Sequence, residues 1–267
     1  RYRIRELENY QINKSIIMKL YYILLLLAFP LSAQINVVPQ PNEVHYYKGS
    51  CKVNTPITYI TEPTIANPEG YQLVIQPRKI TVKYSAEAGK YYATQTLRQL
   101  IFQAKKEHKE SLPCLTITDA PRFAYRALMV DPARHYWKIE DLKKYIDVMS
   151  QYKFNYLHLH LNDDQGWRIE IKKYPKLTEI GAKRTNFEGS KHNNEGFYTQ
   201  EEMKDLVRYA LERNVQLIPE FDVPGHNDAA VAAYPFLSCN DTIIGVRTTA
   251  GVSKNLLCVS KKEVFIF

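Results

Sequence analysis

Residues 127–167 decide the fold, and they read ALMVDPARHYWKIEDLKKYIDVMSQYKFNYLHLHLNDDQGW. The apolar run 127–130 predicts a strand that ends at Asp131. Apolar residues then recur at helical spacing and predict an amphipathic helix: Ile139, Leu142, Ile146 and Met149. Residues 156–161 predict the next strand. Two strands separated by a helix of this length form a βαβ unit, so the strands are expected to pair in parallel.

A second unit follows along the chain. Thr199 and Glu202 have the spacing of a capping box and mark the start of a helix. Its apolar face is predicted at Met203, Leu206, Val207, Ala210 and Leu211. Asn214 can end this helix, and residues 215–219 predict a third strand. The chain after residue 122 therefore predicts part of a parallel barrel or sheet.

Polar side chains cluster where each predicted strand ends. They are Asp131 and Arg134, then Asp163 and Asp164, then Glu220, Asp222 and His226. The carboxyl ends of parallel strands lie on one face of a barrel or sheet. Three such clusters predict a functional site there.

Residues 34–122 predict a small α/β accessory domain. Residues 71–76 and 80–84 flank a Pro-Arg turn and predict a hairpin. The helical spacing of apolar residues from Tyr92 to Ala104 predicts a helix, and the apolar run at 115–118 predicts a further strand.

The first 33 residues are excluded from the fold. From Met18 to Ala33 a basic head, an apolar middle and small residues follow the pattern of a secretory signal peptide. Residues 1–17 precede that methionine and are interpreted as an upstream translation artefact. The apolar run is too short for a stable membrane anchor. We therefore expect a secreted or periplasmic protein that begins at Gln34.

Charge and cysteine content narrow the partners. The net charge is +8, but the basic residues are scattered among acidic ones, which argues against nucleic-acid binding. The four cysteines have no CxxC or zinc-like spacing, and export permits disulfides. Cys239 and Cys258, which would close a short loop, are the candidate pair. Cys51 with Cys114 is a second possibility.

Three signals could carry chemistry, and each has a structural alternative. His158 and His160 alternate on one strand and could begin a metal site, although hydrogen-bonded core histidines are the preferred interpretation. His226 follows a rigid Pro-Gly turn and is either functional or structural. Arg134 offers a fork of donors for a carboxylate or sugar hydroxyls, or else a surface ion pair.

Five sequence strings together carry a specific resemblance. They are YYATQTLRQLI (91–101), ITDAPRFAYRALMVD (117–131), DPARHYW (131–137), NYLHLHLNDDQGWRIEIKKYPKLTEIGAKR (155–184) and IPEFDVPGH (218–226). In this order and at these separations, they resemble the β-N-acetylhexosaminidases of glycoside hydrolase family 20. The resemblance covers about residues 34–267, with an accessory α/β domain before a (β/α)8 barrel.

The resemblance implies removal of terminal β-linked N-acetylglucosamine or N-acetylgalactosamine with retention of configuration. In that mechanism the substrate's own acetamido oxygen attacks the anomeric carbon while a Glu protonates the leaving oxygen. It also implies that Arg134 binds sugar hydroxyls and that Asp163 and His226 form a dyad supporting the catalytic Glu. No cofactor and no metal are expected.

One departure from the family pattern concerns that Glu. The family's adjacent Asp-Glu pair is absent from the sequence after Asp222, and Glu263 is interpreted as a helix-start residue. Residues 123–267 are also too few for the about 250 residues of a complete barrel. We therefore expect a partial (β/α)8 barrel that is inactive and poorly folded alone, with the Asp-Glu pair encoded beyond residue 267.

Two other hypotheses remain open at this point. One is a noncatalytic sugar-binding or scaffold protein of the same fold. The other is a metal-dependent barrel hydrolase that uses His158 and His160.

Overall fold

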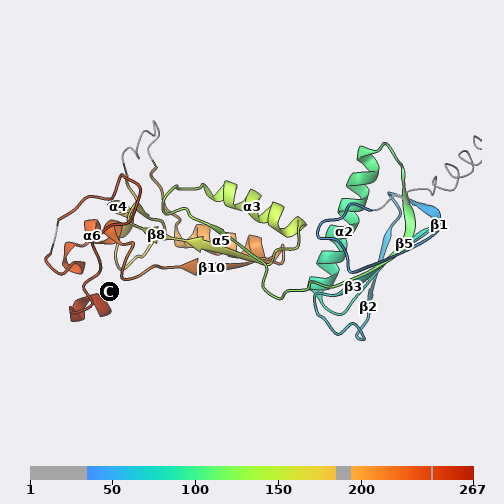
Figure 1. Ribbon diagram of the computed structural model, residues 1–267, viewed down its shortest axis with the longest axis horizontal. Helices are drawn as coiled ribbons and strands as arrows, with labels where there is room; N and C mark the ends of the chain where they lie inside the picture. The colour runs from blue at the N-terminus through green and yellow to red at the C-terminus, as the bar shows by residue number, and fades with distance from the viewer. Residues whose placement is uncertain (1–34, 185–193, 242) are drawn as a thin grey trace, which may run out of the picture. The chain divides into compact units, whose positions relative to one another are not determined.

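The computed structural model describes residues 35–184, 194–241 and 243–267 (Figure 1). The predicted leader segments 1–17 and 18–33 lie outside the described residues. Within the described part of the chain, no helix is both long enough and apolar enough to cross a membrane.

The first part of the fold is a five-stranded sheet covered by one helix. Its strands are β1 (Glu43–Lys52), β2 (Ile57–Thr61), β3 (Tyr71–Gln76), β4 (Lys79–Tyr84) and β5 (Ser111–Asp119), in the order β1-β5-β3-β4-β2. All neighbours are antiparallel except β2 and β4. Helix α2 (Glu87–Lys106) packs on β3, β4 and β5. Alternation places Leu73, Ile75 and Val82 in the core with Tyr92 and Leu97 of the helix.

The second part contains the three predicted parallel strands. They are β6 (Ala127–Val130), β7 (Tyr156–His160) and β10 (Gln216–Glu220), in the order β10-β7-β6. Helices α3 (Ile139–Gln151) and α5 (Gln200–Leu211) connect them. Strands that neighbour one another in chain order and pair in parallel are the arrangement of the start of a (β/α)8 barrel, which confirms the predicted partial barrel.

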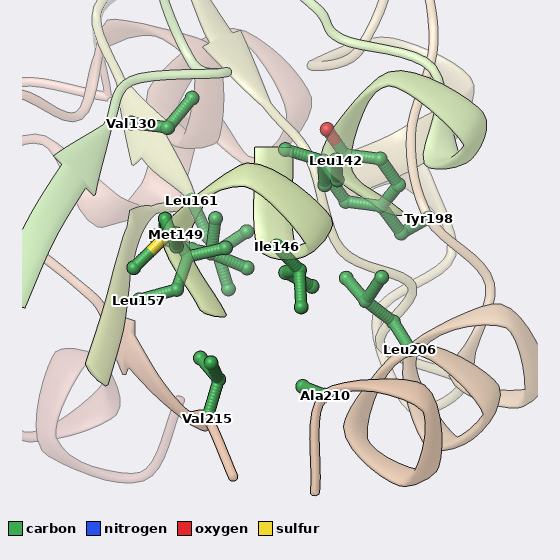
Figure 2. Close-up of a cluster of buried hydrophobic side chains, with 11 residues drawn as sticks. Val130, Leu142, Ile146, Met149, Leu157, Leu161, Tyr198, Leu206, Ala210 and Val215 are labelled. Carbon is green, nitrogen blue, oxygen red and sulfur yellow. The ribbon is translucent and has the colours of Figure 1, made fainter. Parts of the chain in front are cut away.

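The core of this part lies between the sheet and the two helices. Figure 2 shows Leu157 and Val215 on the side of the sheet and Ile146 on α3. Leu206 and Ala210 of α5 belong to the same cluster. The predicted capping box at Thr199 and Glu202 is present and starts α5. Burial of one apolar stripe per helix thus orients both helices on the same face of the sheet.

Short elements follow the strands. The hairpin β8 (Asn162–Asp163) and β9 (Gly166–Trp167) comes directly after β7. Helices α4 (Lys176–Glu179) and α6 (Asp228–Ala233) pack on each other, and the 3-10 turns η1 (Pro235–Leu237) and η2 (Lys262–Phe265) come later in the chain. Glu263 lies in η2.

A disulfide closes the segment after η1. It joins Cys239 and Cys258, whose Cα atoms are 4.7 Å apart, while Cys51 and Cys114 are free and buried. The backbone N–H of Cys258 also donates to the carbonyl of Leu237 at 2.7 Å. The bond therefore holds residues 239–258 as one loop.

A buried ion pair joins the turn after α3 to the antiparallel sheet. The Lys153 ammonium lies 2.8 Å from Asp119 Oδ2 of β5 and 2.9 Å from the Tyr71 hydroxyl of β3. The Lys153 side chain is only 3% exposed and that of Asp119 only 8%. Burial lowers the pKa of Lys153, although the attraction of Asp119 opposes this shift.

This pair predicts a large difference between two lysine substitutions. Lys153→Met leaves the Asp119 charge buried without its cation, so we expect the free energy of unfolding to fall by about 3–5 kcal/mol. Lys144→Met removes only an exposed pair with Asp141 and should change stability little. Urea unfolding of both variants measures the difference, and equal losses would contradict the role assigned to Lys153.

Candidate active site

The site begins on the face of the parallel sheet opposite the helices. Register pairs His160 with Glu220 across β7 and β10. Side chains alternate along a strand, and Leu157 and Leu159 are buried on the helix side. His158, His160 and Glu220 therefore share the other face, which is the inner face of a barrel.

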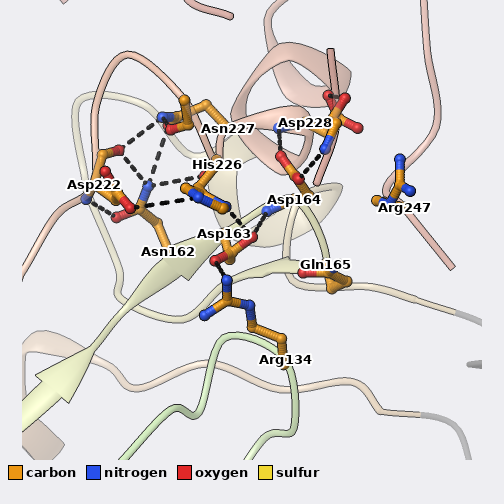
Figure 3. A network of polar contacts seen from close by, with 12 residues as sticks. Arg134, Asn162, Asp163, Asp164, Gln165, Asp222, His226, Asn227, Asp228 and Arg247 are labelled. Carbon is orange, nitrogen blue, oxygen red and sulfur yellow. Dashed lines mark hydrogen bonds and ion pairs between the residues drawn. The ribbon is translucent and has the colours of Figure 1, made fainter. Parts of the chain in front are cut away.

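A buried carboxylate, Asp163, lies at the carboxyl end of this face. The Asp163 side chain is 0% exposed. Its Oδ1 accepts from the Asp164 backbone N–H at 2.6 Å and lies 3.1 Å from Nδ1 of His226. Its Oδ2 lies 2.9 Å from Nε2 of His160 and forms an ion pair with the Arg134 guanidinium. Figure 3 shows the Arg134 and His226 side chains converging on Asp163.

These contacts set the charge states of the group. Burial alone would raise the pKa of Asp163, but hydrogen bonds from His160 and the Asp164 N–H, together with the Arg134 charge, hold that pKa below its usual range. Burial opposes a charged His160, but its hydrogen bonds to Asp163 and Glu220 outweigh burial and raise its pKa. The contacts favour an ionised Asp163 and a protonated His160.

Arg134 reaches the site from the loop after β6. Its Nη1 donates to Asp131 Oδ2 at 2.6 Å, and its backbone N–H donates to Asp131 Oδ1 at 3.0 Å. Burial opposes its charge, but the hydrogen bond and attraction from Asp131 and the charge of Asp163 raise the pKa of Arg134. The Asp131 and Asp163 carboxylates thus fix the position of the Arg134 guanidinium. The side chain is 35% exposed, so it remains accessible to a ligand.

His226 lies in a turn that two asparagines hold. Its φ of 54° is in the left-handed region, which non-glycine residues adopt only when the surroundings fix them. Asn162 accepts from the Asp222 N–H at 2.9 Å and donates to the Asp222 and His226 carbonyls. Asn227 donates to the Asp222 carbonyl at 2.7 Å and to the Gly225 carbonyl. The turn therefore aims the imidazole at Asp163.

Arg168 fixes the loop that carries Arg134. Its guanidinium is fully buried and donates to five backbone carbonyls, at 2.8–3.3 Å, on Pro132, Ala133, Ala182, Asn194 and Gly196. Burial lowers the pKa of Arg168 to about 10, with the neighbouring Arg184 charge adding to the effect. All five N–H groups of an arginine are thus used to tie separate loops together.

Two groups of side chains near the site have the donor types of metal ligands. They are His160, Glu220 and Asp222, and Asp163, Asp164 and His226, each with donor atoms within 4.8 Å of one another. However, Asp163 already contacts two imidazoles and a guanidinium, and Asp164 accepts from the Ser253 and Asp228 N–H groups at 3.0 and 3.3 Å. A bound cation would displace these partners, so the geometry favours a hydrogen-bonded network.

His158 lies 2.6 Å from Glu220, as expected for a histidine that is hydrogen-bonded across strands.

The structure brings together Arg134, Asp163 and His226, the three residues selected from the sequence. No sequence pattern predicts a role for Asn162, Asn227 or Arg168. Asn162 stands among the polar residues after β7, but its partners lie about sixty residues later in the chain. Arg168 was visible only as part of the DDQGWR string.

The carboxylate, the imidazole and the arginine lie at the carboxyl ends of parallel strands, where α/β-barrel enzymes have their active sites. Residues 123–267 match the glycosyl hydrolase family 20 catalytic domain, and residues 57–120 match domain 2 of the same family. The chain therefore belongs to glycosyl hydrolase family 20.

Individual relatives agree with the family match. A beta-hexosaminidase of Akkermansia muciniphila is 42% identical over 237 residues, which cover 88% of this chain and 48% of that protein. A crystal structure of a beta-N-acetylhexosaminidase matches with a TM-score of 0.83 and 41% identity, over 88% of this chain and 50% of the other. A mutant Streptomyces plicatus beta-hexosaminidase in complex with the product GlcNAc matches with a TM-score of 0.77 and 29% identity, over 87% and 55%. The chain thus spans about half the length of these relatives.

The packing around Arg168 predicts different outcomes for two glycines of the site. A Cβ at Gly166 would lie 2.5 Å from the Arg168 guanidinium, which its five hydrogen bonds prevent from moving. We expect Gly166→Ala to lower the free energy of unfolding by about 1–3 kcal/mol. Gly225→Ala is the control, because its nearest neighbour is a Leu256 methyl at 3.7 Å. Equal urea midpoints for the two variants would contradict this account.

Proposed function

We propose that the protein carrying this chain hydrolyses terminal, non-reducing β-linked N-acetylhexosamine residues from glycans or chitooligosaccharides with retention of configuration. The observation that carries the proposal is the buried Asp163, which contacts both His226 and Arg134. Family membership supports it, as do relatives named beta-hexosaminidase, N,N'-diacetylchitobiase and, in one structure, a complex with GlcNAc.

Each side chain has a chemical task in this proposal. Asp163 accepts a hydrogen bond from Nδ1 of His226, which leaves Nε2, 4.0 Å from Asp222 Oδ2, without a proton and able to support an acid. That acid protonates the leaving oxygen while the substrate's acetamido oxygen attacks the anomeric carbon. Arg134, one-third exposed, donates to the sugar's hydroxyls. The acid itself is expected in an Asp-Glu pair, which this sequence does not contain.

Hydrolysis of an aryl β-N-acetylglucosaminide by the complete gene product tests the proposal. We expect turnover, and a fall in kcat of about 10²–10⁴-fold in Asp163→Asn, because the neutral amide no longer fixes His226. Asp141→Asn is the control, since Asp141 lies on the exposed side of α3 and pairs with Lys144. Saturable GlcNAc binding without any turnover would replace the proposal with the noncatalytic sugar-binding alternative.

We also propose that the protein is secreted or periplasmic. The signal-peptide pattern from Met18 to Ala33 supports export, and the Cys239–Cys258 disulfide is of the kind that persists in oxidising compartments. Amino-terminal sequencing of the protein from its native host should find a chain that begins at Gln34. A cytosolic protein that retains residues 18–33 would contradict export.

A further inference from the structure

His160 is buried between two carboxylates. Its Nε2 lies 2.9 Å from Asp163 Oδ2, and its Nδ1 lies 3.0 Å from Glu220 Oε1. The His160 side chain is only 6% exposed, so water does not replace either partner. Both ring nitrogens of one imidazole therefore face an oxygen that can be ionised.

The two contacts constrain where protons lie. An ionised carboxylate only accepts hydrogen bonds, and a neutral imidazole carries a single N–H. Both contacts are therefore hydrogen bonds only if the imidazole carries two protons or one of the carboxyl groups is protonated. Asp163 faces the Arg134 guanidinium and accepts from the Asp164 N–H, which favour its ionised form. Glu220 has its other oxygen 2.6 Å from Nε2 of His158, which can donate.

The charges around the imidazole ring also favour a protonated His160. Charged and titratable groups face it from the ends of all three parallel strands and from the loops that follow them: Asp131, Arg134, His158, Asp163, Glu220, Asp222 and His226. Arg134 is the one residue of this set that is charged positively at every pH of interest. A proton on His160 reduces the resulting excess of negative charge.

We propose that His160 is a positioning residue, held as an imidazolium between Asp163 and Glu220, that keeps Asp163 ionised and so fixes the tautomer of His226. The ionised Asp163 accepts through its second oxygen from Nδ1 of His226 at 3.1 Å. Nε2 of His226 then carries no proton and can accept one, and the His226 side chain is 28% exposed for that purpose. The catalytic meaning of this step rests on the proposed function, whereas the protonation states do not.

Nitrogen NMR of ¹⁵N-histidine-labelled protein tests the protonation states without any activity. We expect one imidazole, assigned by its loss in His160→Gln, to lose its second proton only at a pH above the ordinary histidine pKa of about 6.5. We expect His226 to be protonated at Nδ1. Glu220→Gln should lower the pKa of His160, because the ring loses an ionised acceptor. A His160 imidazole that is already mostly neutral at that ordinary value in the unsubstituted protein would overturn the proposal.

The pH dependence of hydrolysis by the complete gene product tests the consequence. In His160→Gln, Asp163 loses a neighbouring cation and becomes protonated at higher pH, so the acid limb of kcat should move up by about one unit or more while KM changes little. His45→Gln is the control, because His45 is exposed and lies 4.0 Å from Glu43. An unshifted acid limb with a uniformly lower kcat would show a merely structural role. If no hydrolysis occurs at all, the proposed function fails while the NMR result still decides the role of His160.

Discussion

The buried carboxylate of Asp163 is the interaction on which the site depends. It lies at the end of β7 and β8 and contacts Arg134 from the loop after β6 and His226 from the turn after β10. A fully buried carboxylate is costly unless it is paired and hydrogen-bonded, and this one has four partners. The same contacts that offset that cost also fix the positions of Arg134, which is proposed to bind the sugar, and of His226, which is proposed to support the acid.

The rest of the chain can be understood as support for that arrangement. The buried Arg168 guanidinium ties the loop before Arg134 to three distant carbonyls, and the Asn162 and Asn227 amides fix the turn that carries His226. Site residues are thus held by side chains that are themselves buried, as precise chemistry requires. The core between the sheet and helices α3 and α5 keeps the strand ends in register.

Much of this could be predicted from the sequence. The three parallel strands, helices α3 and α5 and the capping box at Thr199 follow from apolar periodicity and capping chemistry. The strand ends predicted where the site lies, and the resemblance to the family selected Arg134, Asp163 and His226 among the polar residues there. Strands β1 and β2 were not predicted, because they are the edges of their sheet and most of their side chains are exposed, so no apolar alternation marks them. Asn162, Arg168 and the second acceptor of His160 depend on partners far along the chain, which local patterns do not contain.

The central claim is that Asp163 is ionised and held so by its cationic partners. A pH titration of the ¹³C-labelled aspartate carboxyl groups measures this directly, with the Asp163 signal assigned by its absence in Asp163→Asn. The account predicts that the Asp163 carboxyl titrates below the ordinary aspartate pKa of about 3.9. Its lowered pKa also means that the stability it contributes is present above that ordinary value and is lost as the pH falls further. An Asp163 signal that titrates above the ordinary value would contradict the account.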